Sequence, residues 1–478
     1  MSVLDTIIVV VYLVVLVCIG YFAGRGVKTN EDAVVAGRSF KSFTAAVGKA
    51  ANLAGGSTSV GGTGYGYNFG LSGMWYGLSN LVTSLLAAPF CKRIWKAMQR
   101  GKFISIGEYL GYRFGRPANF IANILNLFAY MGFVASQVVA TGTICHALLG
   151  WDLNTAMVIT TIVVILYTCT GGLKAVVYTD YMQLVVLFLG MIFILLPKSI
   201  HAVGGVDALV TALPESFLNV GSMGWFTIIG VIVVPTVLNT VTMQAFYGYL
   251  ASCKDEKAAW KSSVQAGFLY IFPAVAVVII GMCAVVLYPD LASGNDALPT
   301  MVMNLLPKGV IGILFAACIA ATMSTSDTCL LCSATCFTNI YKEFIKKDAT
   351  DKEVLKVSRI SMAVIGAGVL MITMFNQDII SLITMGYALG VGGLLVPFFA
   401  CYFSKRATSA GCLASMLVGG ISYFILNNTV SWPALFVSLP ASAVAMVVVS
   451  MLTPAPDPKC YDLYFDEEWE KNHPEAAK

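Results

Sequence analysis

Long apolar stretches follow one another along almost the whole chain, and short polar segments separate them. A membrane-spanning helix needs about 20 mostly apolar residues, because the hydrocarbon core of a bilayer is about 30 Å thick. Windows of this length predict about thirteen spanning helices. Their approximate limits are 6–24, 43–67, 72–91, 118–149, 153–170, 175–200, 224–250, 263–288, 307–341, 358–376, 379–403, 409–427 and 431–453. We therefore expect an all-α polytopic membrane protein, with a single transmembrane domain over residues 1–453 and an acidic tail over residues 454–478.

The distribution of Lys and Arg between alternate loops predicts the orientation of these helices, because cytoplasmic loops carry an excess of basic residues. If the first helix starts outside, 26 of the 29 Lys and Arg residues fall on the inner side. Lys198 and Lys308 fall on the outer side, and Lys49 lies inside a span. We expect the N-terminus outside, the tail in the cytoplasm, and the protein in the plasma (inner) membrane.

The composition argues against most other classes of protein. Of the 478 residues, 58% are hydrophobic and 11% are charged, whereas soluble domains are about 25% charged. A net charge of +4, spread evenly, provides no basic surface for nucleic acid. The three histidines (His146, His201 and His473) are far apart in sequence, which argues against a histidine metal site. We see no nucleophile–base pair and no cofactor motif, so we do not expect an enzyme.

Three ionisable residues fall inside predicted spans: Lys49, Asp180 and Asp327. Each costs at least about 2.5–3.5 kcal/mol there, so each is a candidate functional residue. Lys49 is close enough to the start of its span for its side chain to reach the cytoplasmic headgroups. Asp180 could pair with a cytoplasmic Lys, whereas Asp327 lies deeper, which favours a functional role.

The second predicted span has an unusual sequence for a helix. Gly55-Gly56 lies beside Asn52, Ser57 and Thr58, and a series of glycines follows over residues 61–70. Each glycine weakens a helix by about 1 kcal/mol relative to alanine. Unwound backbone at membrane depth is tolerated only where it lines a cavity or binds something. Close helix packing through small residues is the alternative, and it accounts better for the later glycines than for Gly55-Gly56.

The ninth predicted span contains a run of polar residues, Ala320-Ala321-Thr322-Met323-Ser324-Thr325-Ser326-Asp327-Thr328. Single Ser and Thr hydroxyls can bond back to their own helix and would mean little. Ser324, Thr325 and Asp327 together supply hard oxygen ligands, which suit Na⁺ far better than a soft metal. The run therefore indicates a cation site.

These segments resemble the sodium:solute symporter family. The resemblance covers nearly the full length and is carried by Ala36-Gly37-Arg38, the glycine-rich second span, Gly171-Gly172-Leu173-Lys174-Ala175-Val176-Val177-Tyr178-Thr179-Asp180 with Gln183, the run 320–327, and Asn339-Ile340-Tyr341-Lys342-Glu343. It implies the inverted-repeat, LeuT-like fold. The first helix (6–24) would be extra, the repeats would cover about 43–200 and 224–403, and two helices (409–453) would follow. The second and seventh spans would be the interrupted pair.

The resemblance also implies a sodium site between the interrupted second span and the ninth span. Carried over, its ligands are the carbonyls of Ala51, Ala54 and Ala321 and the hydroxyls of Ser324 and Thr325. An alternative register would choose the carbonyls of Ala50 and Leu53. Asp180 and Asp327 are the candidates for ion coupling or for a second cation.

Lys49 departs from the family pattern because it lies close to the proposed sodium carbonyls. If its ammonium entered the site, it would replace Na⁺ and indicate proton coupling or weaker ion dependence; if it reaches the headgroups, the sodium site is unaffected. The candidates for solute binding are Asn52, Ser57, Thr58, Gln137, Gln244 and Phe246. None of them is a carboxylate, which disfavours a cationic solute, and no arginine lies in these spans.

The sequence thus favours a sodium-coupled secondary active symporter that imports a small polar organic solute by alternating access. A proton-coupled or uncoupled carrier of the same fold is the nearest alternative, and an ion channel is a weaker one. The expected partners are the solute, Na⁺ and the lipid bilayer, without nucleic acid. The expected assembly is a monomer or a weak homo-oligomer.

Overall fold

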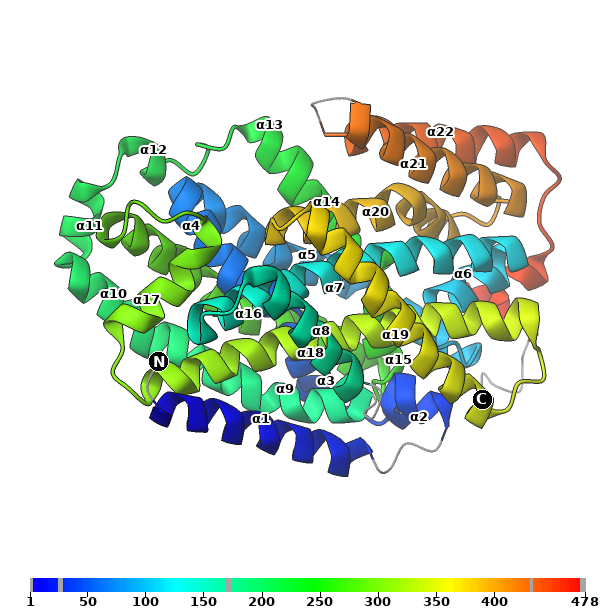
Figure 1. Cartoon of the computed structure of the whole chain (residues 1–478). Coiled ribbons are helices and arrows are strands. Elements are labelled where there is room, and N and C mark those ends of the chain that lie inside the picture. Colours follow the sequence, from blue (N-terminus) through cyan, green and yellow to red (C-terminus); the bar gives the residue numbers. More distant parts are fainter. Residues whose placement is uncertain (1–2, 25–28, 169–172, 430–432, 473–478) are drawn as a thin grey trace.

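The computed structural model describes residues 3–24, 29–168, 173–429 and 433–472. Within these ranges the regular structure is helical, apart from an isolated bridge between Phe40 and Cys253. In Figure 1, α1 (Val3–Gly24) lies along one edge of the helix bundle, and α21 and α22 lie together along the opposite edge. Short pieces of the predictions fall outside the described residues: 169–170 of the fifth span, Gly171 and Gly172 of the motif, 431–432 of the last span and 473–478 of the tail.

The long helices follow the predicted spans in order. After α1 they are α3 (Ser42–Leu53) with α4 (Gly62–Phe69), α5 (Met74–Arg100), α7 (Arg116–Leu149), α8 (Leu153–Thr168), α9 (Leu173–Phe188) with α10 (Leu196–Val203), α13 (Trp225–Thr227) with α14 (Val234–Asn239) and α15 (Gln244–Ala251), α16 (Glu256–Leu287), α18 (Val310–Ile340), α19 (Asp351–Phe375), α20 (Ile379–Phe403), α21 (Ser409–Thr429) and α22 (Leu435–Leu452). Shorter helices that the sequence analysis does not predict are α2 (Asn30–Val35), α6 (Ile106–Phe114), α11 (Val206–Ala212), α12 (Glu215–Leu218), α17 (Ala297–Leu305) and α23 (Asp466–Asn472).

Nine helices in the described part of the chain are long and apolar enough to cross a membrane. The predicted spans without a counterpart among these nine are the first, second, third and fifth. The first and fifth appear as shorter apolar helices, Val3–Tyr12 and Leu153–Ile165. The second is interrupted, and the third (α5) carries Ser79, Asn80, Thr83 and Ser84 and ends in basic residues. The structure therefore supports a polytopic all-α protein without establishing the count of thirteen.

Two of the predicted spans are interrupted, as expected for the second and seventh. Helix α3 ends at Leu53, and a π-helical segment (Ser57–Gly61) leads into α4. In the seventh span, α14 ends in a tight turn, and Met243 has an extended backbone (φ −99°, ψ 134°) before α15 begins. Both breaks contribute residues to one cavity. The structure therefore shows a break in each of these two spans.

The glycines that follow the first break allow α4 to pack closely on α16. A side chain at Gly66 would collide with the backbone of Val278, and one at Gly281 would collide with the backbone of Thr63. Close helix packing therefore accounts for this part of the glycine series. Gly55 differs, because a side chain there would meet the Thr325 hydroxyl and the Gln137 amide.

Segments predicted to lie on the same side of the membrane meet in the structure. On the predicted inner side, the Phe40–Cys253 bridge joins the loop after α1 to the loop after α15, and an Arg116–Glu343 ion pair of 2.6 Å joins the ends of α7 and α18. On the predicted outer side, Trp75 Nε1 donates to the Val220 carbonyl (2.8 Å). These contacts agree with the alternation of loops that the basic residues predict.

The tail folds back onto the predicted inner ends of α5, α6 and α20. Asp466 forms ion pairs with Lys96 (3.0 Å) and Arg100 (2.8 Å), and Glu468 pairs with Lys405 (3.0 Å). The Tyr464 side chain is buried. The acidic residues of the tail thus form ion pairs with basic residues near the ends of α5 and α20, a contact that the sequence analysis does not predict.

Candidate functional site

The site begins at the end of α3, where the backbone carbonyls lose their helical partners. The Asn52 carbonyl faces the Thr325 hydroxyl of α18 at 3.4 Å, and the Leu53 carbonyl accepts the Thr58 hydroxyl at 2.6 Å. The Ala54 backbone N–H donates to the carbonyls of Ala50 (2.9 Å) and Ala51 (3.1 Å). Oxygen atoms from backbone and hydroxyl groups therefore gather where α3 meets α18.

Helix α18 presents consecutive hydroxyls to this corner and to α9. The Thr325 hydroxyl also contacts the carbonyl of Ala321 (3.1 Å), one turn earlier in its own helix. The Ser324 hydroxyl donates to the carboxylate of Asp180. All of these side chains are buried. The corner thus combines the two α18 hydroxyls with a carboxylate, and all of the atoms offered are hard oxygen ligands.

Asp180 and Asp327, the two acids predicted to lie inside spans, are both buried but have different partners. Asp180 accepts the Ser324 hydroxyl with one oxygen, and its Oδ2 has no hydrogen-bond partner among the described residues. Asp327 accepts the hydroxyl of Thr168. The structure therefore brings Asp180 to the α3–α18 corner through Ser324, whereas Asp327 is engaged with α8.

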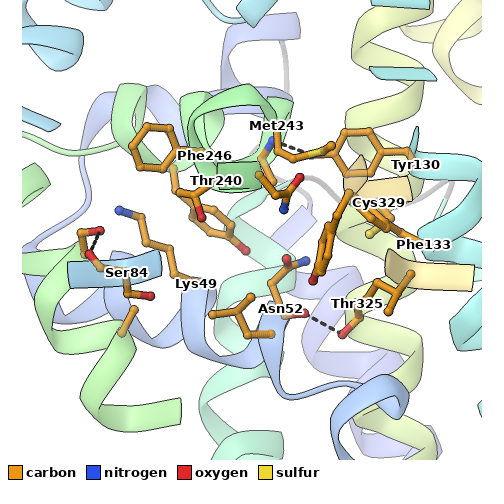
Figure 2. A pocket seen from close by; sticks show the side chains of 18 residues that line it. Lys49, Asn52, Ser84, Tyr130, Phe133, Thr240, Met243, Phe246, Thr325 and Cys329 are labelled. Atoms are coloured by element: carbon orange, nitrogen blue, oxygen red, sulfur yellow. Dashed lines mark hydrogen bonds between the residues drawn. The ribbon is translucent and has the colours of Figure 1, made fainter. Parts of the chain in front are cut away.

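A cavity of about 100 Å³ lies next to this corner and between the two helix breaks. Figure 2 shows Asn52 and Thr325 on one side of it and Phe246 and Thr240 on another. The remaining lining is largely aromatic and apolar, with a few polar groups, which is typical of small-molecule sites. The lining residues are Lys49, Asn52, Leu53, Ser84, Tyr130, Phe133, Asn239, Thr240, Met243, Ala245, Phe246, Tyr249, Ser263, Ala266, Thr325, Cys329, Ile383 and Tyr387.

A family model for the sodium:solute symporter family matches residues 34–419. The chain belongs to this family. Among its curated relatives, the high-affinity proline transporter PutP of Bacillus subtilis is 26% identical over 94% of this chain and 98% of its own length. The sodium/pantothenate symporter of Haemophilus influenzae is 26% identical over 82% of this chain and 84% of its own length. The sodium/glucose cotransporter 1 of Ovis aries is 27% identical over 88% of this chain and 71% of its own length.

Solved structures show the same fold. A substrate-bound, outward-open Na⁺-coupled sialic acid symporter superposes with a TM-score of 0.81 at 18% identity and covers 95% of this chain and 99% of that one. MhsT in complex with L-phenylalanine superposes with a TM-score of 0.54 at 14% identity and covers 86% of this chain and 98% of that one. These likenesses concern the fold, and the relatives' names differ in the solute that they state.

Within this family fold, the residues expected to bind sodium lie together only in part. The Thr325 hydroxyl faces the end of α3 and also contacts the Ala321 carbonyl of its own helix, and Ala54 lies in the break. The Ala51 carbonyl accepts the Ala54 N–H, and the Asn52 carbonyl is the one that faces Thr325. Ser324 is turned to Asp180.

Of the residues expected to bind solute, Asn52 and Phe246 line the cavity. Ser57, Thr58 and Gln137 lie outside its lining and make contacts around the break. The Gln137 side-chain oxygen accepts the Gly56 N–H (2.7 Å), Thr58 contacts the Tyr270 hydroxyl (2.9 Å), and Ser57 accepts the Tyr76 hydroxyl (3.3 Å). These three residues therefore hold the backbone of the break in place.

Gln244 is also outside the lining. Its side chain accepts the Ile106 N–H and donates to the Ile104 carbonyl, both at 2.8 Å. It thereby joins the start of α15 to the segment before α6. The structure gives Gln244 a positioning contact and no contact with the cavity.

The sequence analysis missed the aromatic lining, including Tyr130, Phe133 and Tyr387. The Tyr130 hydroxyl oxygen also accepts the backbone N–H of Ala245 (2.7 Å), just after the second break. Tyr130 and Phe133 precede Gln137 on α7 at spacings that place all three near one helix face. This spacing to Gln137 was the only sequence signal for the two aromatic residues. It is a weak one, because aromatic residues are common in apolar helices.

Lys49 lies inside the helix bundle. Its ammonium donates to the Ser262 hydroxyl of α16 (2.9 Å) and sits 5.6 Å from the centre of the Phe246 ring. In Figure 2 the side chain points toward Phe246 and away from Thr325. Its ammonium is therefore engaged by α16, at the predicted inner end of the eighth span, and does not lie at the α3–α18 corner.

Proposed function

We propose that this chain is a sodium-coupled secondary active symporter, which imports a small polar organic solute by alternating access. The observation that carries the proposal is the approach of the Thr325 hydroxyl to the Asn52 carbonyl at the end of α3 (3.4 Å). Membership of the sodium:solute symporter family and the likeness to a Na⁺-coupled symporter support sodium as the coupling ion.

The proposed sodium site lies at this corner. Its candidate ligands remain the carbonyls of Ala51, Ala54 and Ala321 and the hydroxyls of Ser324 and Thr325, and the direction of the Asn52 carbonyl adds a further candidate. Na⁺ would take the place of the Thr325 hydroxyl hydrogen, which now faces the carbonyls of Asn52 and Ala321. Asp180 would supply negative charge beside the ion.

Sodium and solute would be coupled through α3. Asn52 contributes its carbonyl to the corner, and the same residue lines the cavity. An ion that fixes the end of α3 would therefore also fix one wall of the solute site. Each positive charge that moves inward across 100 mV releases about 2.3 kcal/mol, in addition to the sodium concentration term.

The proposal includes the finer architecture of the family: thirteen spans, inverted repeats over about 43–200 and 224–403, an external N-terminus and a cytoplasmic tail. It also includes residence in the plasma (inner) membrane as a monomer or weak homo-oligomer. The interrupted pair α3/α4 and α14/α15 supports this arrangement, because half-helices that meet at one site are typical of inverted-repeat transporters.

The test measures the sodium concentration that gives half of the Na⁺-induced rise in melting temperature of the purified protein, because a ligand that binds the folded state stabilises it. Thr325→Ala and Ser324→Ala should each raise this concentration about fivefold or more, since one lost polar contact is worth about 1 kcal/mol. Thr335→Ala is the matched control, because the Thr335 hydroxyl bonds to Leu331 of its own helix (2.8 Å). Unchanged sodium dependence in both Thr325→Ala and Ser324→Ala would refute the site.

A proton-coupled carrier is the second candidate, and the unpartnered Oδ2 of Asp180 favours it, because a buried carboxylate of this kind can hold a proton as well as attract a cation. Stabilisation by Na⁺ over K⁺ at fixed pH separates the two. Equal melting temperatures in Na⁺ and K⁺, together with a dependence on pH that Asp180→Asn removes, would favour proton coupling.

A further inference from the structure

Lys49 is the only Lys, Arg, His, Asp or Glu in the lining of the cavity, within the part of the chain that the structure describes. It comes from α3, three residues before Asn52, and this spacing places both residues on one helix face. The cavity therefore carries one fixed positive charge on the same wall that the proposed sodium site would order.

The surroundings of Lys49 supply no negative charge. Its ammonium contacts a neutral hydroxyl, that of Ser262, and lies over the Phe246 ring. None of the ion pairs formed by the described residues includes Lys49. Ionisable residues inside a membrane domain commonly pair with an opposite charge, and none of the described residues forms such a pair with Lys49.

The nearby acids do not fill this role. Asp180 accepts the Ser324 hydroxyl and Asp327 accepts the Thr168 hydroxyl, and neither residue lines the cavity. Asn52, another lining residue, has a side-chain nitrogen with no hydrogen-bond partner among the described residues. The wall formed by α3 thus offers donors and a positive charge to whatever occupies the cavity.

We propose that the Lys49 ammonium is the counter-charge for a carboxylate of the transported solute, and that the solute is a small organic monoanion. This inference rests on the proposed function and names its substrate class. A monoanion neutralises the one charge of the lining, whereas a neutral polyol leaves it uncompensated. A zwitterion would bring an ammonium group for which the lining holds no carboxylate.

The arrangement also gives sodium and solute a direct electrostatic link. Na⁺ at the α3–α18 corner would add a second positive charge beside the cavity, and attraction between opposite charges is strong where water is excluded. Binding of the anion would therefore strengthen with sodium. The affinity for a neutral solute would increase with sodium only because the ion fixes the position of α3.

The test uses purified full-length protein in 150 mM NaCl, a concentration of about physiological ionic strength. The probes are acetate, propionate, lactate, pyruvate and benzoate, each beside its neutral amide, with glucose as the neutral solute and proline as the zwitterion. The measured quantity is the probe concentration that gives half of the maximal rise in melting temperature. The variants are Lys49→Met, which removes the charge, and Lys49→Arg, which keeps it. Lys41→Met is the matched control, since Lys41 is exposed at the start of the same helix.

We expect at least one carboxylate to stabilise the wild-type protein, with its amide at least about tenfold weaker, as a charge-assisted hydrogen bond of about 1.5–3 kcal/mol implies. Lys49→Met should weaken that carboxylate by about tenfold or more while keeping the stabilisation by Na⁺ alone, which also shows that the variant is folded. Lys49→Arg should retain most of the affinity, and Lys41→Met should match the wild type.

Several results would overturn the proposal: amides that bind as well as their acids, carboxylate binding that survives in Lys49→Met, or stabilisation by glucose or proline and by none of the five acids. Stabilisation by no probe at all counts equally against it. The sodium response is read separately, so failure of the anion proposal leaves a sodium-dependent rise in melting temperature, whereas failure of the proposed function removes that rise.

Discussion

Asp180 reaches the proposed sodium ligands through one hydrogen bond, which its carboxylate accepts from Ser324. The residue is fully buried, and its second oxygen lacks a partner among the described residues. Leaving a buried charge without compensation is costly. A cation that binds beside Ser324 would relieve this cost.

Asp180→Asn should therefore raise the sodium concentration for half-maximal stabilisation by about tenfold or more, because a contact to a charged group is worth about 1.5–3 kcal/mol. The measurement is the sodium titration of the melting temperature. Asp327→Asn is the comparison: its carboxylate bonds to Thr168 in α8, so its effect on sodium should be smaller. Equal effects of the two substitutions would contradict the separate placement of the two acids.

At the scale of residues, the sequence predicted the polar atoms at the break better than the lining of the cavity. Asn52 and Thr325 were recognisable because polar groups are rare inside apolar helices. The role of Gln244 was not, because its partner Ile106 lies 138 positions away and the bond depends on how α6 meets α15. Tyr130 and Phe133 gave no distinct signal, since aromatic side chains are frequent throughout such helices.

Helices α4 and α16 pack so closely that only glycine fits at Gly66 and Gly281. Gly66→Ala would place a methyl group against the Val278 backbone, which cannot move aside as a side chain can. Gly420→Ala in α21 makes the same chemical change, but its new methyl group meets only the Leu125 side chain, at 3.5 Å. Both changes gain about 1 kcal/mol of helix propensity.

The Gly66→Ala variant should accordingly be less stable than Gly420→Ala by about 1–3 kcal/mol, the usual cost of overpacking. The free energy of unfolding can be measured by denaturant titration in mixed micelles, with both variants beside the wild type. A Gly66→Ala protein as stable as Gly420→Ala would show that α4 and α16 can separate without cost.

The helices themselves were predictable where an apolar run is long. The break in α3 had a local cause, because Gly55-Gly56 beside polar residues favours unwinding. The break before α15 had none, since Thr240 to Met243 reads as part of an apolar run, and the expectation there came from the family resemblance. Short helices such as α6 and α17 escaped detection, because a window of about 20 residues averages them with their flanking loops.

At the scale of the whole molecule, the contacts between loops agree with the orientation in the membrane that the basic residues predict. Lys308, just before α18, and Lys352, in the first turn of α19, are both exposed. If 26 of the 29 basic residues mark the cytoplasmic side, Lys308 faces outward and Lys352 inward.

Variants that each add one cysteine test this orientation, in a background where Cys18 and Cys460, the described cysteines that are not buried, are replaced. The same background without an added cysteine gives the level of labelling to subtract. A membrane-impermeant maleimide should label Lys308→Cys in intact cells, and Lys352→Cys only after the membrane is permeabilised. Labelling of Lys352→Cys alone in intact cells would mean that the chain is inserted the other way round.

The folded-back tail has a consequence for biosynthesis. Arg93 lies 4.3 Å from the Phe465 ring and Arg113 lies 5.0 Å from the Tyr461 ring, so both guanidinium groups stack on residues that follow α22 in the chain. A ribosome adds these aromatic partners only when nearly all the helices have already left the exit tunnel. Until then the two arginines lack these aromatic partners, so a chain that stops before Tyr461 should leave more of both guanidinium groups uncovered.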